Sequence, residues 1–267
     1  MIKIAFLGTP NFVQPIKDTL AKRFTLVDSL NEADLAVVAA FGKILTKEEL
    51  NTPKFGAVNV HPSLLSKYRG PSPIQSAILN GDKISGISII KMDEEMDHGP
   101  ILYQESLELS DRDTFDTLSK KMFLQAAAVL PKIIEKFLAG KIQPKEQNHI
   151  NATFCKLLTK ESGYFDLPAG RQVSTDFLRT LDKRIRAYYP WPSAWTKWNG
   201  KIVKFLPFRH PDPPVGGEGS LDLFQNKSGD SSLVTQNDRF LLQMEGKKAI
   251  SLKDFLNGYP DFPIKNL

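Results

Sequence analysis

The sequence predicts an α/β fold in which a mostly parallel sheet with connecting helices is followed by a smaller, β-rich domain. Short apolar runs alternate with amphipathic stretches up to about residue 140, which is the pattern of a parallel sheet joined by helices. A polar stretch, Gln143–Asn151, then indicates a linker, which we place at 147–158, between domains at 1–146 and 159–267. Beyond it, short runs of β-forming residues alternate with turn residues, as in a small barrel.

Four runs in the first domain have the composition of buried strands. Lys3–Leu7 is apolar and β-branched and stops at Gly8-Thr9-Pro10. Leu35–Ala40 is apolar at every position, as in a parallel strand covered on both faces. Ala57–Val60 and the isoleucine-rich Ile84–Met92 complete the predicted sheet.

Three amphipathic stretches predict the connecting helices. The first spans about 12–22, with Thr9 or Asn11 as its cap. The second begins with a capping-box pattern at Ser72 and a proline at the first helical position. The third and longest spans about 111–139, with apolar residues at helical spacing.

One connection in this pattern is too short. Thr25–Leu30 resembles a second strand, yet only Asn31–Asp34 separates it from the buried run at Leu35. A crossover between parallel strands needs a dozen or more residues, so these two runs cannot be parallel neighbours. Three alternatives remain: the first run lies outside the sheet, it pairs antiparallel, or a strand–helix unit is missing here.

The second domain is expected to be small and β-rich. Strands are predicted at Lys201–Leu206, Ser231–Thr235 and Phe240–Glu245, and a brief helix at Ser251–Asn257. The segment Asp212–Gly219 is rich in proline and glycine and is expected to be a loop.

The net charge of +5 belongs to the second part of the chain. Residues 1–147 hold 18 basic and 18 acidic side chains, whereas residues 148–267 hold 17 and 12. A basic second domain can bind a polyanion, although an excess of this size is equally typical of a solvated surface.

The chain carries no sign of a membrane or oxidising environment. Its longest apolar run, Leu35–Phe41, is far too short to cross a bilayer, and the N-terminus has no cleavable signal pattern. The single cysteine, Cys155, excludes an internal disulfide and is interpreted as a small buried side chain. We therefore expect a cytoplasmic protein with no membrane partner.

Asn59, His61 and Asp97 are the candidate catalytic residues. Residues two apart on a strand project to the same face, so Asn59 and His61 point together from the carboxyl end of a buried strand. Ligands bind at that end of open α/β sheets. Asp97 lies after another strand, in the turn Glu94–Pro100, and can join them if the two strands are close.

This set of groups suits attack on a carbonyl carbon. An amide N–H can hold an oxyanion, and a carboxylate favours the protonated form of a nearby imidazole. No serine or cysteine in these segments is an obvious nucleophile, so the attacking group would be a substrate amine or water. The spacing of the four histidines matches no metal site, and none is expected. The alternative is that Asn59 and His61 only tie down a loop.

Several motifs of the first domain resemble one enzyme family. FLGTP at 6–10, AFGKIL at 40–45, NVHPSLL at 59–65 and MDEEMDHGP at 92–100 are similar to motifs of the 10-formyltetrahydrofolate-dependent formyltransferases. The resemblance implies a Rossmann-like catalytic domain that uses 10-formyltetrahydrofolate as co-substrate without a metal. It implies catalytic roles for Asn59, His61 and Asp97. It also implies a folate site that includes Ser63, Leu64, Leu65 and Ser66, where the family usually has proline at the last position.

The second half resembles the C-terminal domain of the methionyl-tRNA formyltransferase family. The matching segments are LTKESG at 158–163, IRAYYPWPSAWT at 185–196 and FLNGY at 255–259. The resemblance implies an OB-like barrel that helps to hold initiator methionyl-tRNA, in a protein expected to be a monomer. Its phosphate-binding candidates are Arg184, Arg186, Lys201 and Lys204, although a basic residue of this kind is more often a solvated charge.

The chain departs from that family in two places. Between Lys22 and Leu35 the family usually has a further strand, a basic loop that enters the tRNA acceptor stem, a helix and a third strand, and this chain lacks them. Asp166–Gln172 differs from the usual Asp-Trp pattern and is a candidate insertion. Other readings therefore stay open: a nucleotide-linked amino sugar as formyl acceptor, water as nucleophile, or a non-catalytic RNA-binding protein. Gly8-Thr9-Pro10 lacks the glycine pattern of a dinucleotide-binding protein.

Overall fold

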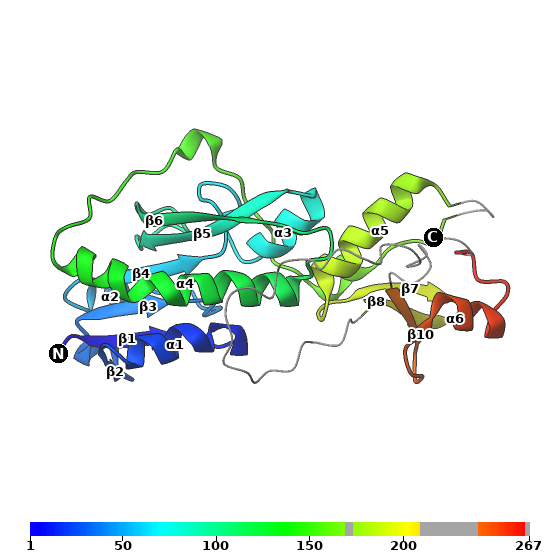
Figure 1. Ribbon diagram of the computed structural model, residues 1–267, viewed down its shortest axis with the longest axis horizontal. Coiled ribbons are helices and arrows are strands. Elements are labelled where there is room, and N and C mark those ends of the chain that lie inside the picture. The colour runs from blue at the N-terminus through cyan, green and yellow to red at the C-terminus, as the bar shows by residue number, and fades with distance from the viewer. Residues whose placement is uncertain (169–172, 209–239, 265–267) are drawn as a thin grey trace, which may run out of the picture. The chain divides into compact units, whose positions relative to one another are not determined.

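A computed structural model describes residues 1–168, 173–208 and 240–264 of the chain. These residues form two compact units, Met1–Thr159 and Lys160–Leu267 (Figure 1). The predicted strand Ser231–Thr235, the predicted loop Asp212–Gly219 and part of the candidate insertion Asp166–Gln172 lie outside the described residues.

The first unit is built on a six-stranded sheet, which confirms the predicted α/β fold. The strands follow the order β2-β1-β3-β4-β5-β6 across the sheet. The first four pair in parallel, whereas β5 is antiparallel to both β4 and β6. The strands are β1 (Lys3–Leu7), β2 (Thr25–Val27), β3 (Leu35–Val38), β4 (Ala57–His61), β5 (Ile84–Lys91) and β6 (Ile101–Glu108).

The short connection between β2 and β3 has a simple geometric solution. β2 pairs in parallel with β1 on the side away from β3, so the two runs are indeed not neighbours. The alternatives of an antiparallel strand and of a segment outside the sheet are both wrong. β2 has only three residues, so residues 28–34 are free to form the connection to β3. This connection crosses two strand spacings, about 10 Å, and seven extended residues reach about 25 Å, so its length is sufficient.

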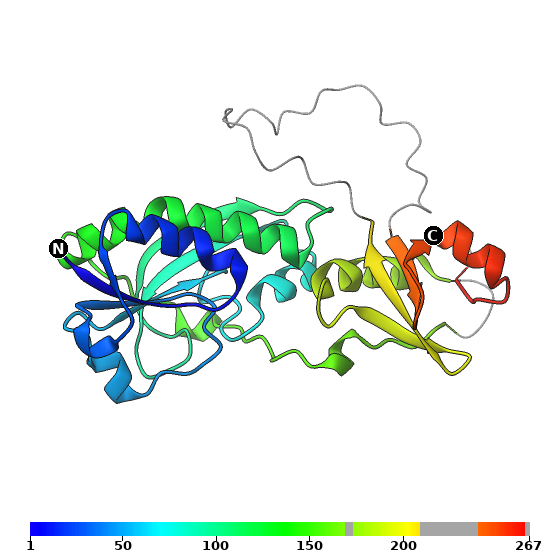
Figure 2. The same ribbon diagram turned by 90° about the horizontal axis from the view of Figure 1, so that it is seen from below.

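The helices of the first unit cover the sheet. α1 (Gln14–Ala21) and α4 (Phe115–Leu138) lie side by side along one face (Figure 2), and Phe12 packs against Phe115 and Phe123 beneath them. The shorter helices are α2 (Lys47–Asn51) and α3 (Pro73–Asn80). The described residues also contain the 3₁₀ turns η1 (Asn11–Val13), η2 (Leu30–Glu32), η3 (His149–Asn151) and η4 (Lys160–Gly163), the last of these in the second unit.

The predicted helix caps are wrong in detail. Neither Thr9 nor Asn11 caps the first helical segment, since the Thr9 hydroxyl donates to the carbonyl oxygen of Ala40 instead. Ser72 precedes α3 as predicted, but its hydroxyl donates at 2.5 Å to the carbonyl oxygen of Lys156. In both cases an acceptor from a distant segment competes with the local helix for the side chain.

The described part of the second unit is a four-stranded antiparallel sheet with two helices. Its strand order is β10-β9-β8-β7, which confirms a β-rich second domain. Phe205, Phe255 and Phe262 are fully buried and form the centre of its core. Closure into an OB-like barrel stays a prediction. The elements are α5 (Thr175–Tyr188), β7 (Ala194–Trp198), β8 (Lys201–Pro207), β9 (Phe240–Met244), β10 (Ile250–Ser251) and α6 (Leu252–Gly258).

Candidate active site

The carboxyl end of β4 positions two of the predicted catalytic residues. Asn59 lies opposite Val38, the last residue of β3, so β4 extends beyond its parallel neighbour as far as His61. Asn59 is half-buried and His61 is only 3% exposed. Their spacing places both side chains on one face of the strand.

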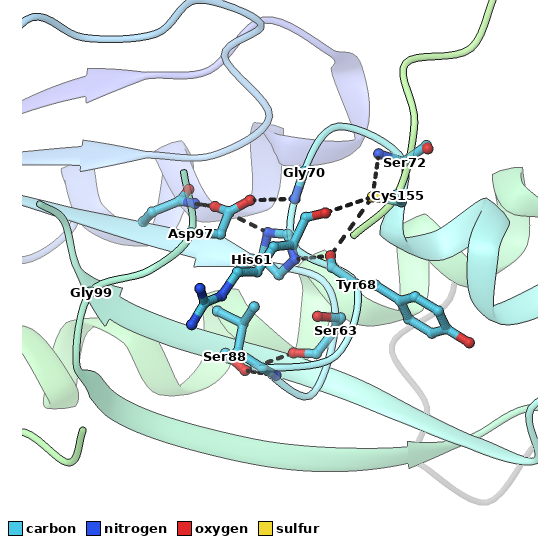
Figure 3. A network of polar contacts seen from close by, with 12 residues as sticks. His61, Ser63, Tyr68, Gly70, Ser72, Ser88, Asp97, Gly99 and Cys155 are labelled. Atoms are coloured by element: carbon cyan, nitrogen blue, oxygen red, sulfur yellow. Dashed lines mark hydrogen bonds and ion pairs between the residues drawn. The ribbon is translucent and has the colours of Figure 1, made fainter. Parts of the chain in front are cut away.

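Asp97 meets both side chains. Its Oδ1 atom accepts a hydrogen bond from Asn59 Nδ2 at 3.0 Å and lies 3.4 Å from His61 Nδ1. Its Oδ2 atom accepts the backbone N–H of Gly70 at 2.8 Å. Figure 3 shows the carboxylate between the His61 ring and Gly70. The predicted convergence of the three residues is therefore present, although β4 and β5 run antiparallel and the segment after β5 must reach along β4 to complete it.

His61 faces oxygen atoms at both ring nitrogens. Its Nε2 atom lies 2.9 Å from the carbonyl oxygen of Tyr68, which can only accept, so Nε2 carries the proton. Its Nδ1 atom faces the Asp97 carboxylate, which when ionised also only accepts. Each ring nitrogen of His61 thus faces an oxygen of the protein, and neither is left to contact a substrate directly.

The surroundings of Asp97 keep its carboxyl group ionised. Burial raises the pKa of Asp97, but the attraction of His61 and the hydrogen bonds from His61, Gly70 and Asn59 outweigh it, and the net pKa lies below the ordinary value. A carboxylate has about four lone-pair sites, and the three contacts leave one open on Oδ2. The group can therefore still accept one hydrogen bond from a substrate.

The backbone at Asp97 adopts a conformation that few residues tolerate. Asp97 has a φ of 51°, in the left-handed region, where aspartate and asparagine are the commonest residues after glycine. Two residues later, a Cβ atom at Gly99 would lie 1.9 Å from the carbonyl oxygen of Lys91, so only glycine fits there. Such a conformation persists where the surrounding contacts enforce it.

The loop 66–72 contacts two of the three residues, since the carbonyl oxygen of Tyr68 meets His61 and the N–H of Gly70 binds Asp97. Gly70 has a φ of 109°, and a Cβ atom there would lie 2.8 Å from the carbonyl oxygen of Cys155. The Cys155 thiol accepts the N–H of Ser72, and burial raises the pKa of this thiol, which fits a structural cysteine. Tyr68 is held by its hydroxyl, which donates to Asp82 and accepts from Asn80.

The residues assigned to the folate site form hydrogen bonds with other residues of the protein. The buried Ser63 hydroxyl donates to the carbonyl oxygen of Lys67, and Ser66 donates to that of Asn148. The N–H of Leu65 donates to the hydroxyl of Ser88. Ser88 and Gln104, which the sequence did not single out, together fix the backbone of this segment, because Gln104 donates to Leu65 O and to Ser88. The folate role of 63–66 stays a prediction.

The four basic candidates of the second unit differ in availability. Lys201 and Lys204 are exposed on β8, three residues apart, and so project to opposite faces of the strand. Arg184 donates to the carbonyl oxygen of Tyr164, and Arg186 forms an ion pair with Asp182 at 2.9 Å. The lysines are therefore better placed to meet a phosphate than Arg186.

Sequence reasoning missed a polar cluster beside the three predicted residues. Arg69 and Gln147 are buried, and Arg69 donates to Gln147 and to Nδ1 of His149. The rings of His98 and His149 stack with centroids 4.1 Å apart. The linker carries no local pattern at Gln147 or Cys155, yet Gln147 donates to the carbonyl oxygen of Asp97 and the Cys155 thiol donates to that of Arg69.

Within residues 1–168, 173–208 and 240–264, no group of three or more His, Cys, Asp or Glu side chains is placed to hold a metal ion. Among the helices of the same ranges, none is long and apolar enough to span a membrane.

Comparison with known proteins identifies the family. A family model described as formyl transferase matches residues 22–134, and one described as formyl transferase, C-terminal domain, matches 175–260. A methionyl-tRNA formyltransferase of Roseiflexus castenholzii is 38% identical over 233 residues, which cover 84% of this chain and 70% of that protein. The chain belongs to the methionyl-tRNA formyltransferase family. It is therefore an enzyme of the formyl-transferring type, as the motifs of both halves predicted.

Solved structures show that the fold is shared within and beyond the methionyl-tRNA formyltransferase family. A methionyl-tRNA formyltransferase from Clostridium thermocellum superposes with a TM-score of 0.62 at 18% identity, over 94% of this chain and 100% of that one. HypX from Aquifex aeolicus, solved in complex with tetrahydrofolic acid, superposes with a TM-score of 0.66 at 17% identity, over 98% of this chain and 48% of that one. At these identities the likeness concerns the fold alone.

Proposed function

We propose that this protein transfers the formyl group of 10-formyltetrahydrofolate to the amino group of initiator methionyl-tRNA. Residues 1–146 are the catalytic domain and residues 159–267 bind the tRNA. The observation that carries the proposal is that Asn59 and His61 both contact the carboxylate of Asp97, in a chain that belongs to this family.

In the first step the amine nitrogen attacks the formyl carbon. A C–N bond forms, and the carbonyl electron pair moves to the oxygen of a tetrahedral intermediate. Asn59 donates one N–H to Asp97, so its second N–H is the donor that we assign to this oxyanion. The charge of the His61 imidazolium adds electrostatic stabilisation from behind Asp97, without a direct hydrogen bond to the substrate.

In the second step the bond between the formyl carbon and N10 of the folate breaks. The nitrogen that has attacked carries a surplus proton, and N10 needs one as it leaves. The open lone pair is on Asp97 Oδ2, the oxygen that also binds the N–H of Gly70, and it can accept the first proton and pass it on. Because no proton is gained or lost in total, a carboxylate of low pKa is sufficient as a relay.

A second candidate acceptor is a nucleotide-linked amino sugar. The reason lies in the segment 23–34, which in this chain contains one basic residue and three acidic ones. The basic residue, Arg23, forms an ion pair with Glu135 at 3.1 Å. This segment therefore offers little to a tRNA acceptor stem, while the formyl-transfer site does not depend on it.

Acceptor choice is tested by supplying one formyl donor with different amines. The protein is incubated with 10-formyltetrahydrofolate and charged initiator tRNA, charged elongator tRNA, a nucleotide-linked amino sugar, or water alone. Formylation of the initiator tRNA at the highest kcat/KM supports the proposal. Preference for the amino sugar supports the second candidate, release of formate without an acceptor indicates hydrolysis, and tRNA binding without any turnover indicates a non-catalytic RNA-binding protein.

A further inference from the structure

We propose that Gln147 and Arg69 are positioning residues, which clamp the turn that carries Asp97 to the loop that binds its carboxylate. This inference rests on the proposed function, since it assigns a role in formyl transfer to residues outside the three catalytic candidates.

Gln147 joins two segments through every polar atom of its side chain. Its Nε2 atom donates to the carbonyl oxygens of Asp97 at 2.9 Å and Gly99 at 2.7 Å. Its Oε1 atom accepts Arg69 Nε at 3.2 Å and Arg69 Nη2 at 2.8 Å. The residue is 6% exposed, so breaking either set of bonds would leave buried polar groups unsatisfied, which is unfavourable.

Arg69 is a buried cation that donates its side-chain hydrogen bonds to neutral groups. It is 4% exposed and donates to Gln147 and to Nδ1 of His149, with the ring of Phe154 5.9 Å from its guanidinium carbon. No ion pair with a carboxylate is found for it among the residues that the structure describes. Burying a charge without an opposite charge costs free energy, so stability alone does not explain this arrangement.

The clamp acts on Asp97 from both sides. Gln147 holds the backbone on either side of His98, at Asp97 and Gly99. Arg69 is adjacent to Gly70, whose N–H binds the carboxylate of Asp97. The turn and the loop are thus tied at two points, the carboxylate and the amide of Gln147. With a φ of 51° at Asp97, the turn has a lower-energy conformation available once the second point is lost.

The expected consequence is a loss of alignment between Asp97 and Asn59. A displacement of about 1 Å in a catalytic group can lower the rate about a hundredfold. Release of the clamp should therefore lower kcat and leave the KM for the acceptor nearly unchanged, because the contacts to the remote parts of the substrate are intact. It should also weaken the hydrogen bonds that Gly70 and Asn59 make to the carboxylate.

The test compares Q147M and Q147E with wild type. Q147M keeps the length of the side chain and removes all four hydrogen bonds, whereas Q147E keeps the acceptors for Arg69 and removes the donors to the turn. Asn148→Ala is the matched control, since the Asn148 side chain only caps the local turn by accepting from Asn151. The measurements are kcat and KM for formylation, and the pKa of Asp97 from carboxyl-carbon NMR of the protein without substrates.

We expect a 10- to 100-fold lower kcat in Q147M and Q147E, acceptor KM within about twofold, and a pKa of Asp97 that rises from its lowered value. N148A should match wild type in all three. An unchanged kcat, or an unchanged pKa of Asp97 in a folded Q147M, overturns the proposal. If neither variant folds, Gln147 is needed for folding and the proposal is also overturned. Wild type without formyl transfer would refute the proposed function, while the NMR measurement would still decide on the clamp.

Discussion

The side-chain amide of Asn59 donates to the carboxylate of Asp97 at 3.0 Å, across 38 residues of sequence. Because an ionised carboxylate only accepts, this contact fixes the orientation of the Asn59 amide, with its NH₂ group toward Asp97. One N–H is used by this bond and the other is left for a ligand. The amide is thus oriented before the substrate arrives, which is the condition for an effective oxyanion donor.

Replacing Asn59 by alanine should remove that donor. We expect N59A to lower the kcat for formylation by about 100- to 1,000-fold, as for the loss of other oxyanion donors. Steady-state kinetics with 10-formyltetrahydrofolate and charged initiator tRNA would measure the effect. Asn51→Ala removes an exposed amide that only bonds to its own helix, at Lys47, and serves as the control. Near-normal turnover in N59A would remove Asn59 from the mechanism.

The lowered pKa of Asp97 predicts how stability depends on pH. The carboxyl group of Asp97 has a pKa in the folded state that lies below its ordinary value of 3.8. At pH values between the folded and the unfolded pKa, the folded state therefore binds fewer protons than the unfolded state. The contribution of Asp97 is therefore complete above about pH 5 and is lost as the pH falls through the folded pKa. We expect the stability difference between wild type and D97N, measured by urea unfolding, to shrink below pH 4. A difference that grows with acidity would contradict the assignment.

Gly70 should be essential both for stability and for activity. An alanine there must adopt a φ of 109° and also place its Cβ atom 2.8 Å from the carbonyl oxygen of Cys155. We expect G70A to lower the free energy of unfolding by about 2–3 kcal/mol or more and to weaken the N–H contact with Asp97.

Gly140 provides the matched control for Gly70. It also has a positive φ, 67°, but no atom lies within 4 Å of a Cβ atom built there. G140A should therefore cost only the conformational term, about 1–2 kcal/mol, without loss of turnover. Equal effects of G70A and G140A on stability, in thermal or urea unfolding, would show that the contact with Cys155 is unimportant.

The strands of the first unit were predictable because burial on both faces leaves a clear apolar run. Their directions were not, since an apolar run such as Ile84–Lys91 has the same composition in a parallel and an antiparallel pair. β6 left no such signal because it is the last strand of the sheet and alternates half-buried or buried residues with exposed ones. The position of β2 at the edge of the sheet could not be predicted, because no pattern in the sequence indicated that this strand has only three residues.

The candidate site was predictable in part for a similar reason. The period of a strand places Asn59 and His61 on one face without further information. The meeting of Asp97 with them depends on the path of a turn, so the sequence pattern supported it only on the condition that the two strands lie close, and the family resemblance pointed to the same residue. Gln147 contacts Asp97 across 50 residues, in a polar stretch that resembles a linker by composition. Residues of this kind carry no local signal, because their role lies in contacts with distant backbone atoms.

The exposed lysines of β8 give a prediction for the proposed tRNA contact. A side chain that neutralises a phosphate releases a counterion, so its removal should reduce the slope of log K against log salt concentration by about one. We expect this change for at least one of K201Q and K204Q. R186Q should have a smaller effect, because Arg186 is 14% exposed at its side chain and forms an ion pair with Asp182.

Binding of initiator tRNA at 50–200 mM salt, followed by fluorescence anisotropy, would measure these slopes. Lys17→Gln removes an exposed charge of the first unit, on α1, and should leave the slope unchanged. Lys201 and Lys204 project to opposite faces of β8. If the tRNA binds along one face of this strand, only one of the two variants should change the slope. The variant that does so identifies the face that binds. If both lysine variants keep the wild-type slope, β8 does not contact the phosphates, and the basic charge of the second unit belongs to a solvated surface.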